Sequence, residues 1–265
     1  GSQVITDCAD FSSRRSDFID GSCDDGHGHG THVTGTVAAA GGQDGKGIFG
    51  VAPDASIYSY KVLADNGFGY ADDIARAIMY AADRGANIIS MSLGSSSPSS
   101  LELDAILYAN SKGVLVIAAA GNSGPEADTI GYPAGFKEVV AVASLNPDEV
   151  VSYYSSRGID DGDDTSIVDR EVEVSGPGRS VISTYKDGAY YTMSGTSMAT
   201  PHIAGLAAKM WQGSASATRS WLVSRAQNHD ITEAEQINNA GTGYDIAAGY
   251  GLPQVTTNSQ ALWQN

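Results

Sequence analysis

The sequence has few basic side chains for its length. Its 265 residues contain 15 Lys and Arg against 31 Asp and Glu, which gives a formal net charge of −16 at pH 7. A negative field of this size repels the phosphates of nucleic acids and anionic membrane surfaces. The composition therefore argues against nucleic acid and membrane partners. Charged residues of both signs make up only 17% of the chain.

Long apolar runs are missing as well. A membrane-spanning helix needs about 20 consecutive apolar residues, and no uninterrupted run of that length occurs. The first residues, Gly1 to Gln3, have neither the basic region nor the apolar core of an export signal. We therefore expect any signal to have been removed or never to have been present. Hydrophobic residues make up 42% of the chain, enough for one folded domain over residues 1–265.

Cysteine is scarce, with only Cys8 and Cys23 in the chain. In an oxidising compartment this pair could close a loop, which on the chain-entropy model would stabilise the fold by about 3 kcal/mol. Two unrelated thiols are the alternative. With so few charges the surface must use Ser, Thr, Asn, Gln and Asp, a composition that favours a secreted protein.

The chain does contain apolar strands that alternate with amphipathic helices, a pattern typical of a parallel sheet covered on both faces. The predicted strands cover 56–63, 87–93, 113–120 and 137–144, with two short strands after a turn at 176–178. The predicted helices cover 33–40, 72–84, 101–111, 197–212 and 217–227. We therefore expect an α/β fold of three layers, αβα, with a mostly parallel sheet.

Three segments carry residues with catalytic potential, and the first is 26–32. It contains His27, His29 and His32, interspersed with glycine. Such imidazoles could bind a transition metal in a metal-dependent hydrolase, although the HExxH pair and the Cys cluster of the usual zinc sites are missing. A surface turn without function is a second interpretation. A general base at the start of a helix made of small residues is the third.

The second segment, 194–202, places Ser197 at the predicted start of a helix. Backbone N–H groups and the helix dipole can stabilise a developing oxyanion there, and a neighbouring base can activate the hydroxyl. An ordinary helix cap is the alternative, although Pro201 so close to the start is unusual for one.

The third segment, 118–124, follows the most apolar strand and contains Asn122. Loops at the carboxyl ends of parallel strands are where α/β proteins bind ligands. The Asn122 amide could donate a hydrogen bond to an oxyanion, and a plain loop-forming role is the alternative.

Taken together, the three segments resemble the signatures of the subtilisin-like serine proteases. The matching stretches are GHGTHVTGT at 28–36, AAAGNSG at 118–124 and SGTSMATPHIAG at 194–205. The resemblance implies a subtilisin-like fold and a secreted, extracellular serine endopeptidase. Cys8 and Cys23, on either side of the approach to the histidine motif, resemble the secreted bacterial branch that contains alkaline and cold-adapted enzymes.

The resemblance also implies roles for single residues. His29 would be the general base, Ser197 the nucleophile, and Asn122 with the Ser197 N–H the donors to the oxyanion. Two segments would pair with an extended substrate as added β-strands do, and a pocket would accept a large uncharged side chain before the cut, with broad selectivity otherwise. The implied substrate-binding residues are Gly67, Phe68, Gly69, Ser92, Leu93, Gly94, Ala119, Ala120 and Gly121.

Structural calcium is a further implication. The glycine-rich loop around Asp44 resembles the calcium loop of the family, and carboxylate and carbonyl oxygens are the ligands that calcium prefers. A second candidate site is the acidic run of Asp160, Asp161, Asp163 and Asp164. A solvated, mutually repelling acidic loop is the alternative interpretation of this run.

One part of the family's pattern does not match. The family places its triad Asp in an Asp-Thr-Gly or Asp-Ser-Gly motif at a strand end before the histidine, and no such motif precedes His29. Asp7 is an imperfect match, and Asp10 a weaker one. We expect the first strand and the triad Asp to lie upstream of residue 1, so that the fold lacks its N-terminal strand and this chain alone is nearly inactive.

The expected partners of the chain are protein and peptide substrates. An associated N-terminal fragment or propeptide is a further expected partner, and the protein itself is expected to be a monomer. Because the Asp motif is missing, a catalytically impaired peptide-binding form of the same fold is the competing function.

Overall fold

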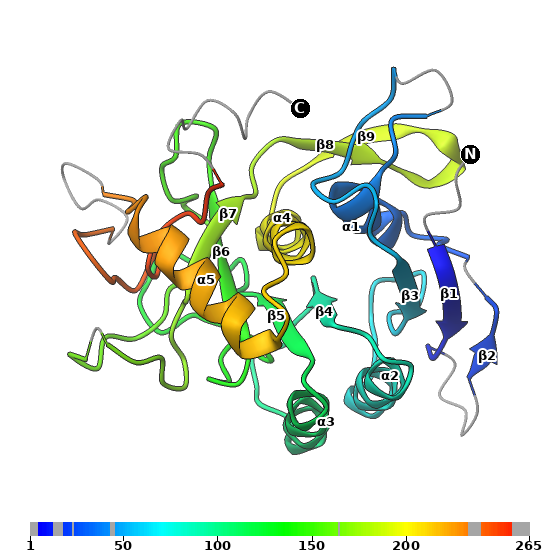
Figure 1. Cartoon of the computed structure of the whole chain (residues 1–265), viewed down its shortest axis with the longest axis horizontal. Coiled ribbons are helices and arrows are strands. Elements are labelled where there is room, and N and C mark those ends of the chain that lie inside the picture. Colours follow the sequence, from blue (N-terminus) through cyan, green and yellow to red (C-terminus); the bar gives the residue numbers. More distant parts are fainter. Residues whose placement is uncertain are drawn as a thin grey trace.

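The centre of the molecule is a parallel sheet of four strands in the computed structural model, which describes residues 5–12, 18–22, 24–42, 46–163, 165–232 and 240–255 (Figure 1). Across the sheet the strands are β4 (Ile88–Met91), β5 (Leu115–Ala119), β6 (Val140–Leu145) and β7 (Val174–Pro177). β5 and β6 are buried along their whole length. Their continuous apolar sequence is what a parallel strand covered on both faces requires.

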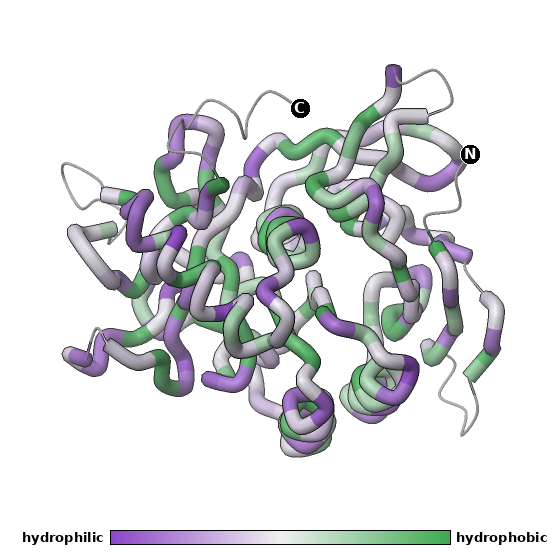
Figure 2. The backbone as a smooth tube through the Cα atoms, in the orientation of Figure 1, coloured by the Kyte–Doolittle hydropathy of each residue, from purple (hydrophilic) through white to green (hydrophobic). Residues whose placement is uncertain are grey.

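Helices cover both faces of this sheet, which confirms the three-layer prediction. α2 (Ala71–Asp83) and α3 (Ser100–Ser111) lie on one face, and α4 (Thr196–Lys209) and α5 (Ala215–Gln227) on the other (Figure 1). Successive side chains of a strand point to opposite faces. In β5, Val116 and Ala118 therefore pack against α2 and α3, whereas Leu115 and Ile117 pack against α4 and α5. In Figure 2 the hydrophobic residues gather along these strands.

A second sheet contains β1 (Ile5–Asp10), β2 (Ile19–Asp20) and β3 (Ile57–Lys61) in the order β2-β1-β3. β3 is parallel to β1, and β2 is antiparallel to it. Rings from the loops next to β1, from β3 and from α2 pack together beside this sheet. They are Phe11, Phe18, Tyr60 and Tyr80.

The remaining elements are a hairpin and one further helix. β8 (Val181–Thr184) and β9 (Tyr190–Met193) are antiparallel, with the short 3-10 helix η1 (Lys186–Gly188) between them. α1 (His29–Ala38) packs beside α4 and against β8. In the part of the chain that the structure describes, no helix combines the length and the apolar character needed to cross a membrane.

Most sequence-based predictions of helices and strands are confirmed within a few residues, but two need correction. The turn predicted at 176–178 is wrong in part, because β7 continues to Pro177. β7 lies at the edge of the described sheet, where proline can end a strand without breaking an inner ladder. The helix predicted at 33–40 begins four residues earlier, at His29, because Gly28 adopts a left-handed conformation with φ 99° and acts as its N-cap.

Candidate active site

Ser197 is the second residue of α4 and lies next to the carboxyl end of β4. The Ser92 hydroxyl, just after β4, donates to the Ser197 carbonyl at 2.7 Å. The Ser197 hydroxyl makes only a long contact of 3.4 Å to the Ser92 carbonyl. The helix start is therefore fixed against the sheet, while its serine hydroxyl is held loosely and can act on another group.

Asn122 follows β5 and is oriented by the same helix start. Its side-chain oxygen accepts from the Thr196 N–H at 2.9 Å and from the Thr196 hydroxyl at 3.1 Å. Because both bonds go to the oxygen, the amide nitrogen is left to donate on the side of Gly195, where a Cβ would come within 3.5 Å of it. The first turn of a helix also leaves N–H groups without intrahelical acceptors. The Asn122 amide nitrogen and the Ser197 N–H are therefore two donors at the start of α4.

We expect Asn122→Ala to lower kcat by about a hundredfold to a thousandfold with little change in KM. Loss of one oxyanion donor in a serine protease costs a factor of this size. The physical reason is that the donor acts on charge that develops only in the transition state. Steady-state kinetics on a peptide substrate, with the triad Asp supplied, checks it. An equal rise in KM with unchanged kcat would assign Asn122 to substrate binding instead.

His29 is the first residue of α1. Because α1 packs on α4, His29 lies at the end of this helix pair where Ser197 also lies. His32 of α1 interacts electrostatically with His202 of α4, and a Cβ at Gly205 would lie 3.5 Å from the Val37 carbonyl. The two helices therefore run side by side in the same direction, and both begin at the end of the sheet where β4 and β5 finish.

Burial lowers the pKa of His29 below 6.5, and the neighbouring His27 and His32 lower it further, whereas Asp25 raises it. The imidazole is therefore mainly neutral at pH 7, the form that a general base requires. Among the described residues, no hydrogen bond reaches the His29 ring, and none joins it to the Ser197 hydroxyl. Catalytic hydrogen bonds are often loose before substrate binds.

Asp7 and Asp10, the two acids considered as triad members, bind other groups. Asp7, on β1, accepts from the Tyr60 hydroxyl at 2.6 Å and pairs with Arg84 at 3.1 Å. Asp10 accepts from the Ser12 hydroxyl and backbone. Neither carboxylate acts on His29, and Asp25 is the one described carboxylate that affects the pKa of this histidine.

The predicted substrate-binding residues fall into two groups. Ser92, Leu93 and Gly94 follow β4. Ala119 is the last residue of β5 and Ala120 and Gly121 follow it, so both segments lie at the same edge of the sheet next to α4. Gly67, Phe68 and Gly69 form a separate turn after β3, closed by the bridge between Leu63 and Gly69. Phe68 is 77% exposed there. This turn is near the histidine segment, because a Cβ at Gly67 would lie 3.8 Å from His27 Nε2.

The predicted calcium ligands are only partly within the described residues, because Asp44 and Asp164 lie outside them. Asp160 accepts from the Gly162 N–H at 2.8 Å, and Asp161 from the Asp163 N–H at 2.8 Å. Asp163 accepts from the Thr165 N–H at 3.0 Å. Within the described ranges, no three His, Cys, Asp or Glu side chains already converge as a metal site.

Cys8 is buried, with 8% exposure, on β1. Its predicted partner Cys23 lies outside the described residues, so the disulfide stays a prediction.

Sequence reasoning missed two residues that organise the site. Thr196 fixes the Asn122 amide, and Asp25 hydrogen-bonds the backbone around His29. Thr196 offered no signal beyond its place next to Ser197. An acidic residue just before a helix is a capping signal. Asp25 was not identified as one because glycines lie between it and the predicted helix.

A serine at the start of α4, a histidine at the start of the parallel helix α1 and an oriented amide after β5 lie at one end of the molecule, an arrangement that suits acyl transfer by a serine nucleophile. Comparison with known proteins is more specific. The family model described as the subtilase family matches residues 7–251. The chain therefore belongs to the subtilase family.

Individual relatives agree with this assignment. The chain is 48% identical to a subtilisin of Bacillus sp. strain TA39 over 95% of its own length, and it spans 62% of that relative. It is 42% identical to subtilisin DY of Bacillus licheniformis over 77% of its length, which corresponds to 72% of that protein.

Solved structures are similar too. A structure named sphericase matches with a TM-score of 0.90 and 48% identity, covering 95% of this chain and 85% of the other. One named S41 psychrophilic protease matches with a TM-score of 0.90 and 47% identity, covering 96% and 86%.

Proposed function

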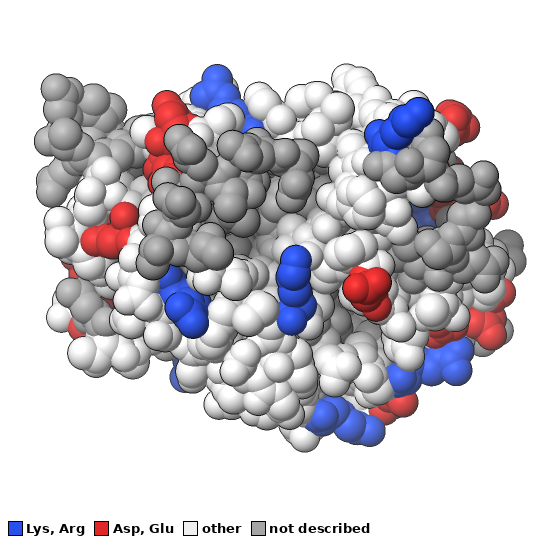
Figure 3. Space-filling view, turned by 45° about the horizontal axis from the view of Figure 1, so that its top comes forward, with Lys and Arg blue, Asp and Glu red and all other residues white. Residues whose placement is uncertain are grey.

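We propose that this chain forms the peptidase domain of a secreted, monomeric serine endopeptidase. The observation that supports the proposal is the anchoring of the Asn122 side-chain oxygen to Thr196, because it leaves the amide nitrogen to donate at the start of α4, where Ser197 follows Thr196. No nucleic acid or membrane partner is expected. The basic side chains on the face drawn in Figure 3 are scattered among uncharged and acidic residues and form no patch.

The proposed reaction is acyl transfer in two halves. His29 takes the proton of the Ser197 hydroxyl as the oxygen attacks the peptide carbonyl, and then gives that proton to the leaving amine. The negative charge on the carbonyl oxygen is stabilised by the Asn122 amide and the Ser197 N–H. Water, activated by His29, then releases the acyl group and regenerates Ser197.

The substrate would be an extended peptide held by its backbone between the segment after β4 and the turn after β3. Backbone pairing gives little selectivity for sequence. The side chain before the cut would lie between Ser92 to Gly94 and Ala119 to Gly121. Because these residues are small or apolar, we propose a preference for large uncharged side chains.

We further propose that the triad Asp is supplied by a strand that lies between β3 and β4 and ends in the Asp motif of the family. Among the described strands, β3 pairs only with β1, and β4 only with β5. In Figure 1, β3 is the next strand in line after β4. Ser90 of β4 is exposed and Ile89 only half-buried, whereas β5 is buried throughout. A parallel strand inside a covered sheet is normally buried, so these edges favour a further strand.

A peptide-binding form without catalysis is the second candidate. It is favoured by one observation, namely that no described acid hydrogen-bonds His29. This form would keep the segments that pair with peptide backbones but not the triad.

The proposed function is tested by peptide hydrolysis. The chain, with and without an N-terminal segment that carries the Asp, is incubated with a peptide nitroanilide that has an aromatic residue before the cleaved bond. Release of nitroaniline that is faster with the segment supports the proposal. Saturable peptide binding with no release in either form would support the second candidate instead.

We also propose structural calcium, with the acidic loop at 160–164 as the site that has support among the described residues. Glu171 is 2% exposed, and one of its oxygens is buried without a hydrogen-bond partner. Burial raises the pKa of Glu171, and the neighbouring Asp161, Asp160 and Asp163 raise it further, although the Val168 N–H lowers it. A bound divalent cation stabilises neighbouring carboxylates, and their oxygens are suitable calcium ligands.

We expect a chelator to lower the melting temperature. At a calcium concentration of 100 times Kd, bound calcium stabilises a protein by about 2.7 kcal/mol, which corresponds to a shift of about 5 to 10 °C for a chain of this size. Calorimetry with calcium and with excess EDTA measures the shift.

Glu171→Gln is the matched variant, because it removes the buried charge and keeps the shape. It should be more stable than the original chain in EDTA and should gain less from calcium. Equal calcium dependence of both proteins would show that Glu171 and its loop are not part of the calcium site. A melting temperature insensitive to EDTA would contradict structural calcium in this protein.

A further inference from the structure

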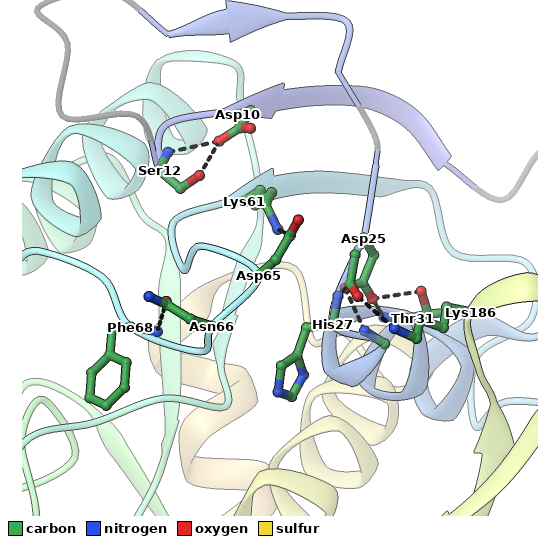
Figure 4. A network of polar contacts seen from close by, with 12 residues as sticks. Asp10, Ser12, Asp25, His27, Thr31, Lys61, Asp65, Asn66, Phe68 and Lys186 are labelled. Carbon is green, nitrogen blue, oxygen red and sulfur yellow. Dashed lines mark hydrogen bonds and ion pairs between the residues drawn. The ribbon is translucent and has the colours of Figure 1, made fainter.

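Asp25 is a half-buried carboxylate four residues before His29, and every hydrogen bond that it accepts comes from the backbone or side chains around that histidine (Figure 4). One oxygen accepts from the Gly28 N–H at 2.7 Å and the His27 N–H at 3.1 Å. The other accepts from the Thr31 N–H and the Thr31 hydroxyl, both at 2.7 Å. Its bonds therefore fall on both sides of His29.

The start of α1 needs such a partner, because its N-cap residue is a glycine. Gly28 has no side chain to accept from the first N–H groups of the helix, which otherwise lack partners. Asp25 supplies the missing acceptor from outside the helix. Burial raises the pKa of Asp25, but the hydrogen bonds from Gly28, Thr31 and His27 outweigh this effect and lower the pKa overall. The carboxylate therefore stays ionised near neutral pH.

On the basis of the proposed function, we propose that Asp25 is the positioning residue of His29, fixing the backbone on both sides of the catalytic imidazole. It does not touch substrate, and no hydrogen bond joins it to the His29 ring. Its contribution is to hold the helix start at which His29 can reach Ser197. A misplacement of about 1 Å at a catalytic group can cost about a hundredfold in rate.

The segment has other anchors, so that the loss of Asp25 should disturb the position of His29 without unfolding the loop. The Tyr185 hydroxyl donates to the His27 carbonyl at 3.0 Å, and Lys186 donates to the Gly26 carbonyl at 2.6 Å. The Thr184 hydroxyl donates to the Thr31 carbonyl at 3.0 Å. All three come from the hairpin side and contact carbonyls, whereas Asp25 binds the N–H groups.

Asp25 also acts on His29 through its charge, which raises the pKa of the imidazole, while the charge of His27 lowers it. The other titratable groups around this segment come from several elements: Asp65 after β3, Tyr185 and Lys186 of the hairpin, His32 of α1 and His202 of α4. His29 acts as a base only when neutral. Removal of the Asp25 charge should therefore move the acid limb of kcat/KM to lower pH, and His27→Asn should move it to higher pH.

The test compares Asp25→Ala, Asp25→Asn and the control Asp24→Asn in the enzyme with its triad Asp supplied. Asp24 is an exposed neighbour of equal charge with no hydrogen bond among the described residues. We expect kcat to fall about a hundredfold in Asp25→Ala and about tenfold in Asp25→Asn, which keeps one acceptor oxygen, with KM changed less than twofold. In both variants the His29 titration, measured by NMR, should move to lower pH by the same amount, because both lose the negative charge of Asp25. Asp24→Asn should match the original protein.

Unchanged kcat in Asp25→Ala would overturn the inference, even if the His29 titration shifts or the melting temperature falls. Absence of hydrolysis in the original enzyme would instead contradict the proposed function. In that case NMR of the backbone still decides the role of Asp25, because a displaced backbone from Gly28 to Thr31 in both Asp25 variants but not in Asp24→Asn supports it and an unchanged backbone refutes it.

Discussion

Ser197→Ala is expected to lower kcat by about six orders of magnitude in the enzyme that has its triad Asp. This magnitude was measured for subtilisin itself and is carried over to its relative here. The physical reason is that the Ser197 oxygen forms the covalent bond, and alanine offers no replacement atom. Hydrolysis of a peptide nitroanilide at high enzyme concentration measures the residual rate.

The fold of this variant should be unaffected. The Ser197 hydroxyl makes only the long contact to Ser92, and the backbone bond from the Ser92 hydroxyl is kept. Ser111→Ala, at the exposed end of α3, is the control and should keep the full rate. A Ser197→Ala protein that retains more than about one thousandth of the rate would exclude Ser197 as the nucleophile.

A strand peptide that carries the family's Asp motif is expected to raise the kcat of this chain by about four orders of magnitude. The acid holds the correct tautomer of His29 and stabilises the imidazolium, and its loss in subtilisin costs a factor of this size. The peptide would pair with the edges of β3 and β4 and bring its Asp to the ring of His29. Titration of the peptide into the chain, followed by hydrolysis, measures the gain.

The same peptide with Asn in place of Asp separates the structural from the chemical effect. It should bind and raise the melting temperature as the Asp peptide does, because strand pairing is unchanged, but leave the rate within a few-fold of the chain alone. Full hydrolysis by the chain without any peptide would show that His29 needs no further acid. Equal activation by both peptides would show that the strand acts only by completing the sheet and not through its Asp.

The residues proposed for the chemistry can be picked out in the sequence because their neighbours restrict them. Ser197 lies at the start of a helix rich in small residues, and Asn122 follows a strand whose apolar run has no polar interruption. The layers were predictable for the same reason, since β5 and β6 must be buried on both faces. These patterns are local, and each can be identified within about ten residues.

The supporting contacts were not predictable in this way because they join distant segments. Thr196 and Asn122 meet only when α4 packs against the end of β5. Asp25 is close in sequence, but its role depends on the left-handed Gly28, which turns the chain so that the carboxylate faces the helix start. β7 was not predicted because it contains Gly176 and Pro177, residues that usually indicate a turn.

The central claim is that His29 activates Ser197, and covalent labelling by a fluorophosphonate tests it most directly. The chain supplied with the Asp strand is treated with the reagent, digested and analysed by mass spectrometry. The account predicts a single adduct on the peptide that contains Ser197, which is lost in His29→Ala and kept in the remote control His229→Ala. An adduct on a different serine, or none on Ser197 in the presence of the Asp strand, would contradict it.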